Sequence, residues 1–418
     1  MSATDMEQPD VPEEVLTAID LGTTKVTVLL GLAREGAVSA IGFGTAPSHG
    51  LMKGTVVDIE TTVEAISRAV REAEAQAGVS AGLAFATIGG NHIHSASSQA
   101  MATIANREHG ITEEDFQRVL EQAQNISLPS DHEILHAIVQ EFSVDNQDGI
   151  RNPVGMYGNK LEARVRIVTG AITCIQNVIR SVQRSGLACG GVILQALAAE
   201  RAVLTPEERE LGAVALDLGG GTTDMAVITG KALRHTAVVT LGGNQITKDI
   251  AFGLRIPFGS AEELKRSAGC CLVSEIRDDE VAQLPAVGGR QPRAVPRRAI
   301  ARIIEPRIEE MLGMVRDELR TAGCPEESLG GGVVLTGGCA HLPFLVEKAE
   351  QVFEQLSARV GEPVQLPGAP DTLRRPEHAC AVGLLLLAAE QRRHAVPRRR
   401  APLFGGVGKW FKGLIKDS

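Results

Sequence analysis

Aromatic side chains are scarce in this chain: only 3% of its 418 residues are Phe, Tyr or Trp, including a single Trp and a single Tyr. The hydrophobic core must therefore be mainly aliphatic, and an apolar fraction of 44% over this length suffices for two domains or more. The 7 cysteines are scattered and include no Cys-x-x-Cys spacing, although Cys270 and Cys271 are adjacent. This pattern argues against a disulfide framework or a zinc site and favours the reduced thiols of a cytosolic protein.

A secretory leader and long hydrophobic runs are also lacking. Residues 1–14 are acidic and polar, so we expect a disordered N-terminus and not a signal peptide. The apolar run 379–389 is too short for a membrane span and predicts a buried helix. The net charge is −9, yet eight Lys or Arg and only one acid follow Glu390, so a basic tail follows an acidic body. The acidic body argues against nucleic-acid binding, and the tail favours an anionic partner.

One pattern occurs twice, with the two copies about half the chain apart. Residues 18–26 read Ala-Ile-Asp-Leu-Gly-Thr-Thr-Lys-Val, and residues 215–224 read Ala-Leu-Asp-Leu-Gly-Gly-Gly-Thr-Thr-Asp. Each copy is an apolar strand that ends in Asp, followed by a Gly/Thr turn and a second apolar strand. The separation assigns one copy to each half of a two-part molecule.

The chemistry of these turns suits a nucleotide phosphate. Glycine lets the backbone approach phosphate oxygens, and successive N–H groups form an anion-binding concavity. An Asp carboxylate reaches phosphate through Mg²⁺, mainly by way of water. A single hairpin of this kind is more often an ordinary strand turn, but two that face each other would clamp the β- and γ-phosphates. We therefore expect Asp20 and Asp217 to act in catalysis and Mg²⁺ binding. The expected phosphate-binding residues are Gly22, Thr23, Thr24, Lys25, Gly219, Gly220, Gly221, Thr222 and Thr223.

Three further groups are candidates for the same site. Gly337 and Gly338 follow a predicted strand at 332–335, and such a turn lets backbone lie against an adenine ring or the α-phosphate. Glu262 and Lys265 lie one turn apart on a predicted helix, where they suit either ribose hydroxyls or a solvent-exposed ion pair. Gln195 follows a predicted strand at 191–194 and could orient an attacking water, although a surface or capping Gln is the simpler interpretation.

The periodicity of apolar residues predicts an α/β fold with two RNase-H-like halves and an insert. In the first half we expect a hairpin at 15–32, a strand at 38–44, a helix at 58–77 that ends at Gly78, and a strand at 84–88. The insert, 92–168, is predicted as strand–helix–strand–strand, with a capping box at Thr112 and strands at 136–142 and 161–169. A helix at 172–184 follows. In the second half we expect helices at 246–252, 260–268, 299–321 and 381–389, with a Gly/Pro/Arg loop at 287–296.

Two basic regions invite a partner. Five arginines gather at the loop and helix start near residue 300, where they form either a solvated basic face or a dock for an acidic peptide; they are Arg290, Arg293, Arg297, Arg298 and Arg302. After a linker at 391–402, residues 403–418 predict an amphipathic helix with Trp and Phe on one side and Lys on the other. Such a helix suits the plane of an anionic membrane better than a docked position on the body. Its expected membrane-contacting residues are Leu403, Phe404, Val407, Lys409, Trp410, Phe411, Lys412, Leu414, Ile415 and Lys416.

The paired Asp-x-Gly-x-Thr hairpins and the Thr-Gly-Gly turn resemble the superfamily of actin, the DnaK-type chaperones and the sugar kinases. The resemblance implies ATP and Mg²⁺ as ligands. It assigns the adenosine to Gly337 and Gly338, the ribose to Glu262 and Lys265, and water activation to Gln195. It also matches Gly383 to the second helix that connects the two halves.

Within that superfamily the chain resembles the FtsA family of bacterial cell-division proteins. The resemblance is carried by 149–156 (Gly-Ile-Arg-Asn-Pro-Val-Gly-Met), by the run around Gly242 and Gly243, by 287–290 and by the terminal amphipathic helix. It also implies that Gly242 and Gly243 bind the nucleotide. It implies subdomain 1A at 15–91 and 169–194, 1C at 92–168, 2A at 195–229 and 313–390, and 2B at 230–312. It also implies a peripheral protein on the cytoplasmic face of the inner membrane, at the division septum. Its partners would be itself, as protofilaments, the C-terminal peptide of tubulin-like FtsZ at 2B, and other division proteins at 1C.

Three other functions compete with this interpretation. A sugar kinase would need an acceptor-sugar pocket and a catalytic carboxylate. A DnaK-type chaperone would need a long peptide-binding domain after the nucleotide domain. The pilus-assembly protein PilM shares the insert but, by resemblance, lacks the membrane helix. Because no strong general base is evident, we expect slow ATP hydrolysis at most.

Overall fold

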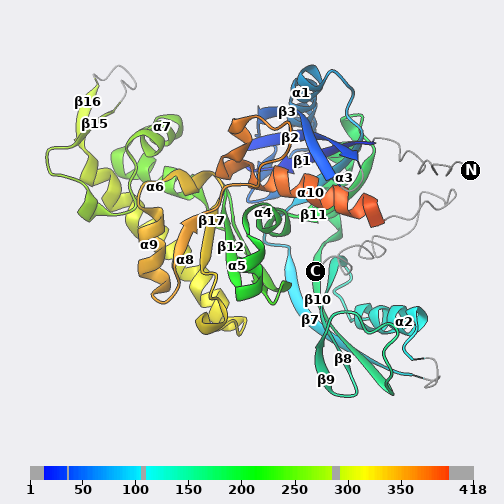
Figure 1. Cartoon of the computed structure of the whole chain (residues 1–418). Coiled ribbons are helices and arrows are strands. Elements are labelled where there is room, and N and C mark those ends of the chain that lie inside the picture. The colour runs from blue at the N-terminus through cyan, green and yellow to red at the C-terminus, as the bar shows by residue number, and fades with distance from the viewer. Residues whose placement is uncertain (1–13, 35–36, 105–109, 285–291, 395–418) are drawn as a thin grey trace, which may run out of the picture.

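Two five-stranded sheets with the same strand order form the body of the molecule (Figure 1). The computed structural model describes residues 14–34, 37–104, 110–284 and 292–394. In each sheet three antiparallel strands are extended by two parallel ones, in the orders β11-β6-β1-β2-β3 and β14-β13-β12-β17-β18. The two predicted hairpins, β1–β2 and β12–β13, occupy equivalent places, which confirms the two-half organisation. The strands of the first sheet are β1 (Glu14–Leu21), β2 (Lys25–Arg34), β3 (Ala37–Pro47), β6 (Leu83–Ile88) and β11 (Cys189–Leu194); those of the second are β12 (Ala213–Leu218), β13 (Thr223–Thr229), β14 (Ala232–Val239), β17 (Val333–Thr336) and β18 (Ala358–Val360).

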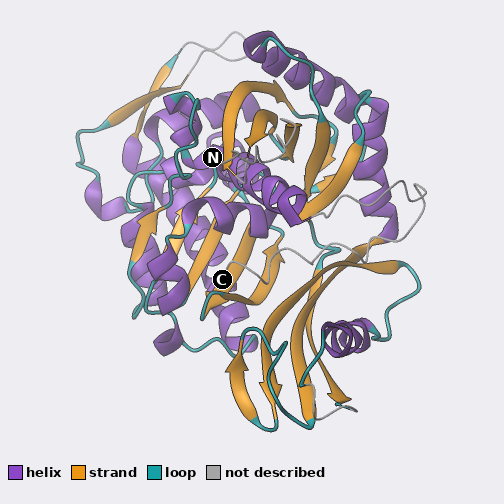
Figure 2. Cartoon of the chain, turned by 45° about the vertical axis from the view of Figure 1, so that its right-hand side comes forward, coloured by secondary structure: helices purple, strands orange, loops and turns teal. Residues whose placement is uncertain are grey.

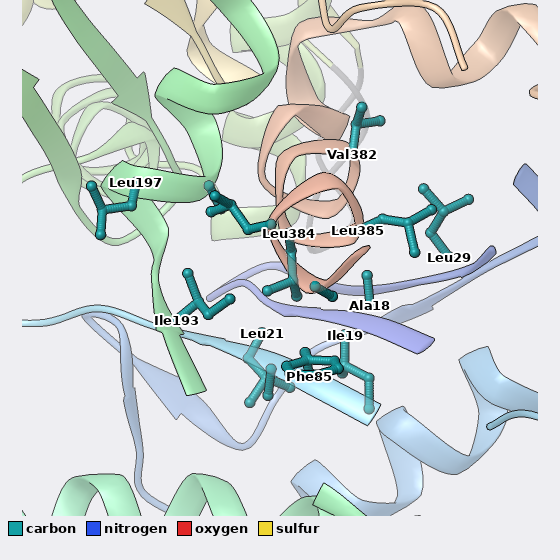
Figure 3. Packing of buried hydrophobic residues seen from close by; sticks show 14 of the residues in the cluster. Ala18, Ile19, Leu21, Leu29, Phe85, Ile193, Leu197, Val382, Leu384 and Leu385 are labelled. Atoms are coloured by element: carbon teal, nitrogen blue, oxygen red, sulfur yellow. The ribbon is translucent and has the colours of Figure 1, made fainter. Parts of the chain in front are cut away.

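Two helices, α4 (Gln195–Val203) and α10 (Ala379–His394), cross between the sheets. Figure 3 shows Leu384 and Leu385 of α10 packed beside Leu29 and the β1 side chains, with Leu197 of α4 farther to the left. These residues belong to one buried aliphatic cluster, which continues into Ala215 and Ala226 of the second sheet. The crossing is close, because a Cβ added to Gly383 would lie 1.7 Å from the carbonyl oxygen of Ala198. The scarcity of aromatic residues is thus matched by a core of small aliphatic side chains.

The outer face of the first sheet carries α1 (Ile59–Ala77) and α3 (Ile172–Arg184). The predicted stop signals of α1 are confirmed: Asp58 caps its start by accepting from the Thr61 N–H, and Gly78 ends it in the left-handed conformation. A small hairpin, β4 (Leu51–Met52) and β5 (Thr55–Val56), precedes α1.

The insert is a separate sheet with the order β7-β10-β8-β9 and one helix (Figures 1 and 2). Its elements are β7 (His94–Thr103), α2 (Glu113–Gln124), β8 (His132–Val144), β9 (Gln147–Ile150) and β10 (Lys160–Ala171). The capping box predicted at Thr112 is present, with Asp115 as its partner. The short β9 was not predicted; it turns back on β8 through Asp145 and Asn146, which both adopt positive φ.

The second half carries its own outer helices, which gather at the end of the molecule opposite the insert (Figures 1 and 2). Its remaining elements are α5 (Pro206–Leu211), α6 (Gly243–Leu254), α7 (Phe258–Ala268), β15 (Val281–Leu284), β16 (Arg293–Pro296), α8 (Arg297–Thr321) and α9 (Leu345–Phe353). Short 3-10 turns occur at Val273–Glu275, Glu326–Ser328, Gly338–His341, Asp371–Arg374 and Pro376–His378.

Several boundaries differ from the sequence-based expectation. Residues 293–296 form β16 and not loop, because they pair with β15. The last helix runs to His394, into the predicted linker, and β1 begins at Glu14, inside the predicted disordered segment. The two ends support each other, since the guanidinium of Arg392 lies 2.8 Å from the carboxylate of Glu14. Residues 1–13 and the predicted membrane helix at 403–418 lie outside the described residues. Within the described ranges, no helix combines the length and apolarity needed to cross a bilayer.

Candidate functional site

The two Gly/Thr turns meet across a cleft between the halves. A Cβ added to Gly220 would lie 2.4 Å from Cγ2 of Thr24, and one added to Gly221 would lie 2.5 Å from Oγ1 of Thr23. Side chains at these glycines would force the turns apart. Between the turns lies a cavity of about 90 Å³. It is lined by Asp20, Gly22, Thr23, Thr24, Lys25, Gln195, Asp217, Gly219, Gly220, Gly221, Thr222, Asp224, Gly337, Gly338, Pro376, Glu377 and Cys380.

Three aspartates line this cavity: Asp20 and Asp224 are buried, and Asp217 is partly buried. Asp20 ends β1 and accepts a 2.9 Å hydrogen bond from Thr87, while Asp217 accepts one of 3.0 Å from the thiol of Cys380. Burial, and next the charge of Asp217, raise the pKa of Asp20 to about 6 and that of Asp224 to about 7. Burial also raises the pKa of Asp217. The charge of Lys25 lowers the pKa of Asp20 and of Asp217, but it does not outweigh the effect of burial.

Asp224 is the least satisfied of the three. Its Oδ2 accepts a 2.7 Å hydrogen bond from Thr222, but its Oδ1 is buried without a hydrogen-bond partner among the described residues. A cation or a bound water would satisfy that oxygen. No three His, Cys, Asp or Glu side chains in the described ranges are placed to hold a metal ion by themselves. Any divalent ion here would therefore need further oxygen ligands from phosphate or water.

Gln195 is a buried residue of the cleft, so the interpretation of a surface glutamine is wrong. It opens α4, and its amide nitrogen donates a 3.1 Å hydrogen bond to the carbonyl of Leu21 at the end of β1. Its Oε1 lies over Gly89, where an added Cβ would come within 2.1 Å of it. The side chain is thus fixed in orientation by the first phosphate hairpin and by the turn that follows β6.

The predicted ribose pair lies beyond the second hairpin. Lys265 is buried; its ammonium lies 2.7 Å from Glu262 and donates to the Gly243 carbonyl at 3.1 Å. The pair is therefore a partly buried ion pair behind Gly243 and not a solvent-exposed one, and it does not line the cavity between the two turns. Gly243 and Asn244 in turn donate to the carbonyls of Gly219 and Gly220, at 2.9 and 2.8 Å. Gly243 and Asn244 thus tie the start of α6 to the second Gly/Thr turn.

Gly337 and Gly338 also lie at the cleft, at the end of β17. Gly337 has φ +84, and a Cβ there would lie 2.2 Å from Oδ1 of Asp217. Both its conformation and its closeness to the carboxylate require glycine. Both glycines line the cavity between the two turns, and their contact with adenosine stays a prediction.

The arginine cluster lies away from the cleft and is largely engaged in structure. Arg297 pairs with Glu280 at 2.7 Å, Arg298 pairs with Asp278, and Arg293 donates to the carbonyl of Leu254. Arg290 lies outside the described residues. Arg297 and Arg298 tie the start of α8 to the segment before β15, and Arg293 ties β16 to the end of α6. Arg302 is exposed, and a dock for an acidic peptide stays a prediction.

Sequence reasoning missed several residues of the cleft. Glu377 lies just before α10, and Cys380 lies in the first turn of this helix. The apolar run of this segment predicts a buried helix but gives no sign of a binding site. Thr87 bridges the site by donating to Asp20 and accepting from the N–H of Leu21, both at 2.9 Å. A polar residue in the otherwise apolar strand β6 was the signal that could have identified Thr87.

Comparison with known families identifies two matching regions. The family described as "Cell division protein FtsA" matches residues 214–383, and the "SHS2 domain inserted in FTSA" matches residues 90–169. The chain is 39% identical to the cell division protein FtsA of Pseudomonas aeruginosa over 412 residues, covering 96% of this chain and 98% of that one. It is 37% identical to FtsA of Escherichia coli strain K12 over 409 residues, covering 96% of each chain.

Solved structures share the fold at low sequence identity. The PilM-PilN type IV pilus biogenesis complex contains a chain with TM-score 0.63 and 16% identity, covering 90% of this chain and 98% of that one. MreB5 of Spiroplasma citri bound to ADP gives TM-score 0.51 and 13% identity, covering 89% and 95%. The MamK double helical filament gives TM-score 0.51 and 12% identity, covering 90% and 98%. These likenesses establish an actin-like fold with an inserted subdomain. Together with nearly full-length identities of 37% and 39%, they show that the chain belongs to the FtsA family of cell-division proteins.

Proposed function

We propose that this protein binds ATP with Mg²⁺ between its two halves and polymerises on the cytoplasmic membrane, where it tethers FtsZ during cell division. The observation that carries the nucleotide proposal is the pair of Gly/Thr turns, one from each half, that line a single cavity with four carboxylates. Backbone N–H groups in such turns favour phosphate oxygens. MreB5 of Spiroplasma citri, which shares this fold, is solved with bound ADP, and this supports nucleotide binding by the chain.

Binding of a whole nucleotide requires the halves to move apart. The cavity of about 90 Å³ is well below the roughly 300–1,000 Å³ of ordinary small-molecule pockets. The β- and γ-phosphates would lie between the turns, and the nucleoside would extend toward Gly337, Glu262 and Lys265. Nucleotide would in this way set the angle between the halves and hence the geometry of a filament.

Magnesium would be held by phosphate oxygens, water and the carboxylates of Asp20 and Asp217, with Asp224 beside them. The elevated pKa values of Asp20 and Asp224 favour this role, because a divalent cation would stabilise the ionised carboxylates. The ion would neutralise phosphate charge. Gln195, fixed by Leu21, is the candidate for positioning a water, and hydrolysis would be slow at most.

The subdomain division implied by the family supplies the partner surfaces. Subdomain 1A would comprise 15–91 and 169–194, 1C 92–168, 2A 195–229 and 313–390, and 2B 230–312. We assign the FtsZ C-terminal peptide to 2B, where Phe252 is 88% exposed beside a cavity of about 580 Å³. Self-association into protofilaments is supported by the filament formed by MamK, and other division proteins would bind 1C. Residues 403–418 would attach the protein to anionic lipids.

The nucleotide proposal is tested by replacing Asp217 with Ala or Asn and measuring Mg-ATP binding by calorimetry. We expect binding to be lost in both variants. Asp371→Ala, which removes an exposed carboxylate from the same half, serves as the control and should bind as the original protein does. Thermal melting of each variant reports whether it is folded. Unchanged affinity in folded Asp217→Asn would refute the site assignment.

A further inference from the structure

The turn between β4 and β5 lies against both phosphate hairpins. The N–H of Gly54 donates a 3.3 Å hydrogen bond to Oγ1 of Thr23 in the first hairpin. A Cβ added to Gly221 in the second hairpin would lie 3.1 Å from the Cα of Lys53. Lys53 therefore belongs to the first half of the chain but touches the phosphate turn of the second.

The turn is fixed in place from a third side as well. A Cβ added to Gly54 would lie 2.8 Å from the backbone nitrogen of Gly90, in the turn that follows β6. Lys53 has φ +49 and Gly54 has φ +77. A lysine in the left-handed region is uncommon and costs free energy, so this conformation is held by the surrounding contacts.

The residues that line the cleft carry a net negative charge, so a lysine beside it would matter for the binding of an anion. Four acidic residues line the cavity, Asp20, Asp217, Asp224 and Glu377, and Lys25 is the one basic residue among the described lining residues. A nucleoside triphosphate with one Mg²⁺ still carries net negative charge, so it needs further positive groups beside these carboxylates.

The ammonium of Lys53 is available for that role. Its side chain is exposed, and within the described part of the chain it forms no hydrogen bond or ion pair. Its flexible four-carbon stem lets the charge reach a phosphate from a backbone position next to Gly221.

We propose that Lys53 is a phosphate-contacting residue, whose ammonium donates to the terminal phosphate of a nucleotide held between the two hairpins. The inference rests on the proposed nucleotide site and adds to it a specificity for the number of phosphates. Because the backbone of Lys53 lies against Gly221, this contact would join the first half to the second hairpin only when a terminal phosphate is present.

The test compares Lys53→Ala, Lys53→Gly and Lys53→Arg with Arg71→Ala, which removes an exposed positive charge from α1 in the same half. Calorimetry measures the binding of ATP, ADP and AMP, each with Mg²⁺. We expect Lys53→Ala to weaken the binding of ATP about tenfold, as for the loss of one charge-assisted hydrogen bond. The binding of ADP should weaken less, and that of AMP by less than about twofold. Lys53→Gly should match Lys53→Ala, because it also removes the ammonium and because glycine accepts the left-handed turn without strain. Lys53→Arg should retain most of the affinity, and Arg71→Ala all of it.

The possible outcomes separate this inference from the nucleotide site itself. If Lys53→Ala binds ATP as the original protein does, the Lys53 assignment is wrong while the site stands. If Lys53→Ala and Lys53→Gly both bind ATP, ADP and AMP more weakly by the same factor, Lys53 has a structural role and the proposal is wrong. If the unaltered protein binds none of the three nucleotides, the nucleotide site fails, and the Lys53 proposal fails with it.

Discussion

The ammonium of Lys25 lies 3.3 Å from Nδ1 of His378, at the base of the cleft. His378 is buried with its ring edge-on to Phe43 at 5.0 Å, and burial followed by the charge of Lys25 lowers the pKa of His378 to about 4. The imidazole is therefore neutral at pH 7 and can accept from the lysine. This contact joins the first phosphate turn to the segment that enters α10, and it directs Lys25 toward the cavity.

We predict that His378 acts on nucleotide affinity through Lys25. Lys25→Met should weaken Mg-ATP binding at least tenfold, because a charged donor to phosphate is lost. His378→Phe keeps the ring beside Phe43 and removes the acceptor, and it should weaken binding about threefold. In a double-mutant cycle, the second change should add nothing to Lys25→Met. Calorimetry measures the affinities. Fully additive losses would show that His378 acts independently of Lys25.

The carboxylates predict an unusual dependence of stability on pH. The pKa of Asp20 is raised to about 6 and that of Asp224 to about 7, so the folded state binds more protons than the unfolded state between about pH 4 and pH 7. Their contribution to stability is therefore present at low pH and is lost as pH rises through the folded pKa values. In the absence of divalent cations, Asp224→Asn should be more stable than the original protein at pH 8, by about 1–3 kcal/mol.

The measurement is urea unfolding of both proteins from pH 5 to pH 8, with and without Mg²⁺ and nucleotide. The stability difference should be smaller at pH 5 than at pH 8, and it should vanish only below about pH 4, where Asp224 is protonated in both the folded and the unfolded state. Added Mg²⁺ nucleotide should stabilise the original protein more at pH 8 than at pH 5. A stability difference that does not vary with pH would contradict the elevated pKa of Asp224.

Much of this fold was predictable because its signals are local. The two Asp–Gly–Thr turns, the Asp58 and Gly78 caps of α1 and the capping box at Thr112 each depend on residues within a few positions. Backbone geometry and short-range hydrogen bonds determine such features, so a sequence pattern suffices to identify them. The duplicated pattern then implied that the two turns face each other.

The rest of the site depends on contacts between distant segments. Lys53 and Gly221 are brought together only when the two halves close, and Cys380 reaches Asp217 only because α10 crosses between the sheets. The extension of α10 past 390 also has a tertiary cause, the ion pair of Arg392 with Glu14. The periodicity of apolar residues carries no information about such pairings. For this reason the predicted start of the linker, residue 391, and the predicted end of the disordered N-terminus, residue 14, both differ from the structure.

Phe252 gives a specific prediction for the FtsZ contact. A phenylalanine that is 88% exposed beside a cavity in 2B suits an apolar anchor residue of a peptide. Phe252→Ser should weaken binding of the FtsZ C-terminal peptide at least tenfold, as for a central interface residue. Tyr157→Ser, which alters a 74% exposed aromatic residue of the insert, is the control. Fluorescence anisotropy of a labelled peptide measures both. Loss of binding in Tyr157→Ser alone would assign the peptide to the insert.

The C-terminal segment predicts a separable membrane function. Deleting residues 403–418 should abolish binding to vesicles of anionic lipid and leave Mg-ATP affinity unchanged, because the proposed nucleotide cleft is lined by residues between 20 and 380. Replacing Lys409, Lys412 and Lys416 with Gln should weaken vesicle binding, and raised salt should weaken binding of the original protein. Co-sedimentation measures the bound fraction. Vesicle binding that persists after the deletion would place the membrane contact elsewhere.

Gly383 makes the crossing of α4 and α10 possible, and this gives a prediction with an internal control. A Cβ at Gly383 would lie 1.7 Å from the Ala198 carbonyl oxygen, so Gly383→Ala must push the two helices apart. We expect a loss of about 2–4 kcal/mol in urea unfolding, since backbone cannot yield as a flexible side chain can. Gly313→Ala on α8 changes the same residue type where no atom lies within 4 Å. Gly313→Ala should leave the stability unchanged or raise it by up to about 1 kcal/mol through helix propensity.

Equal stabilities of the Gly383→Ala and Gly313→Ala variants would show that the crossing of α4 and α10 tolerates a side chain. Because Gln195 opens α4, Gly383→Ala should also weaken Mg-ATP binding, and Gly313→Ala should not.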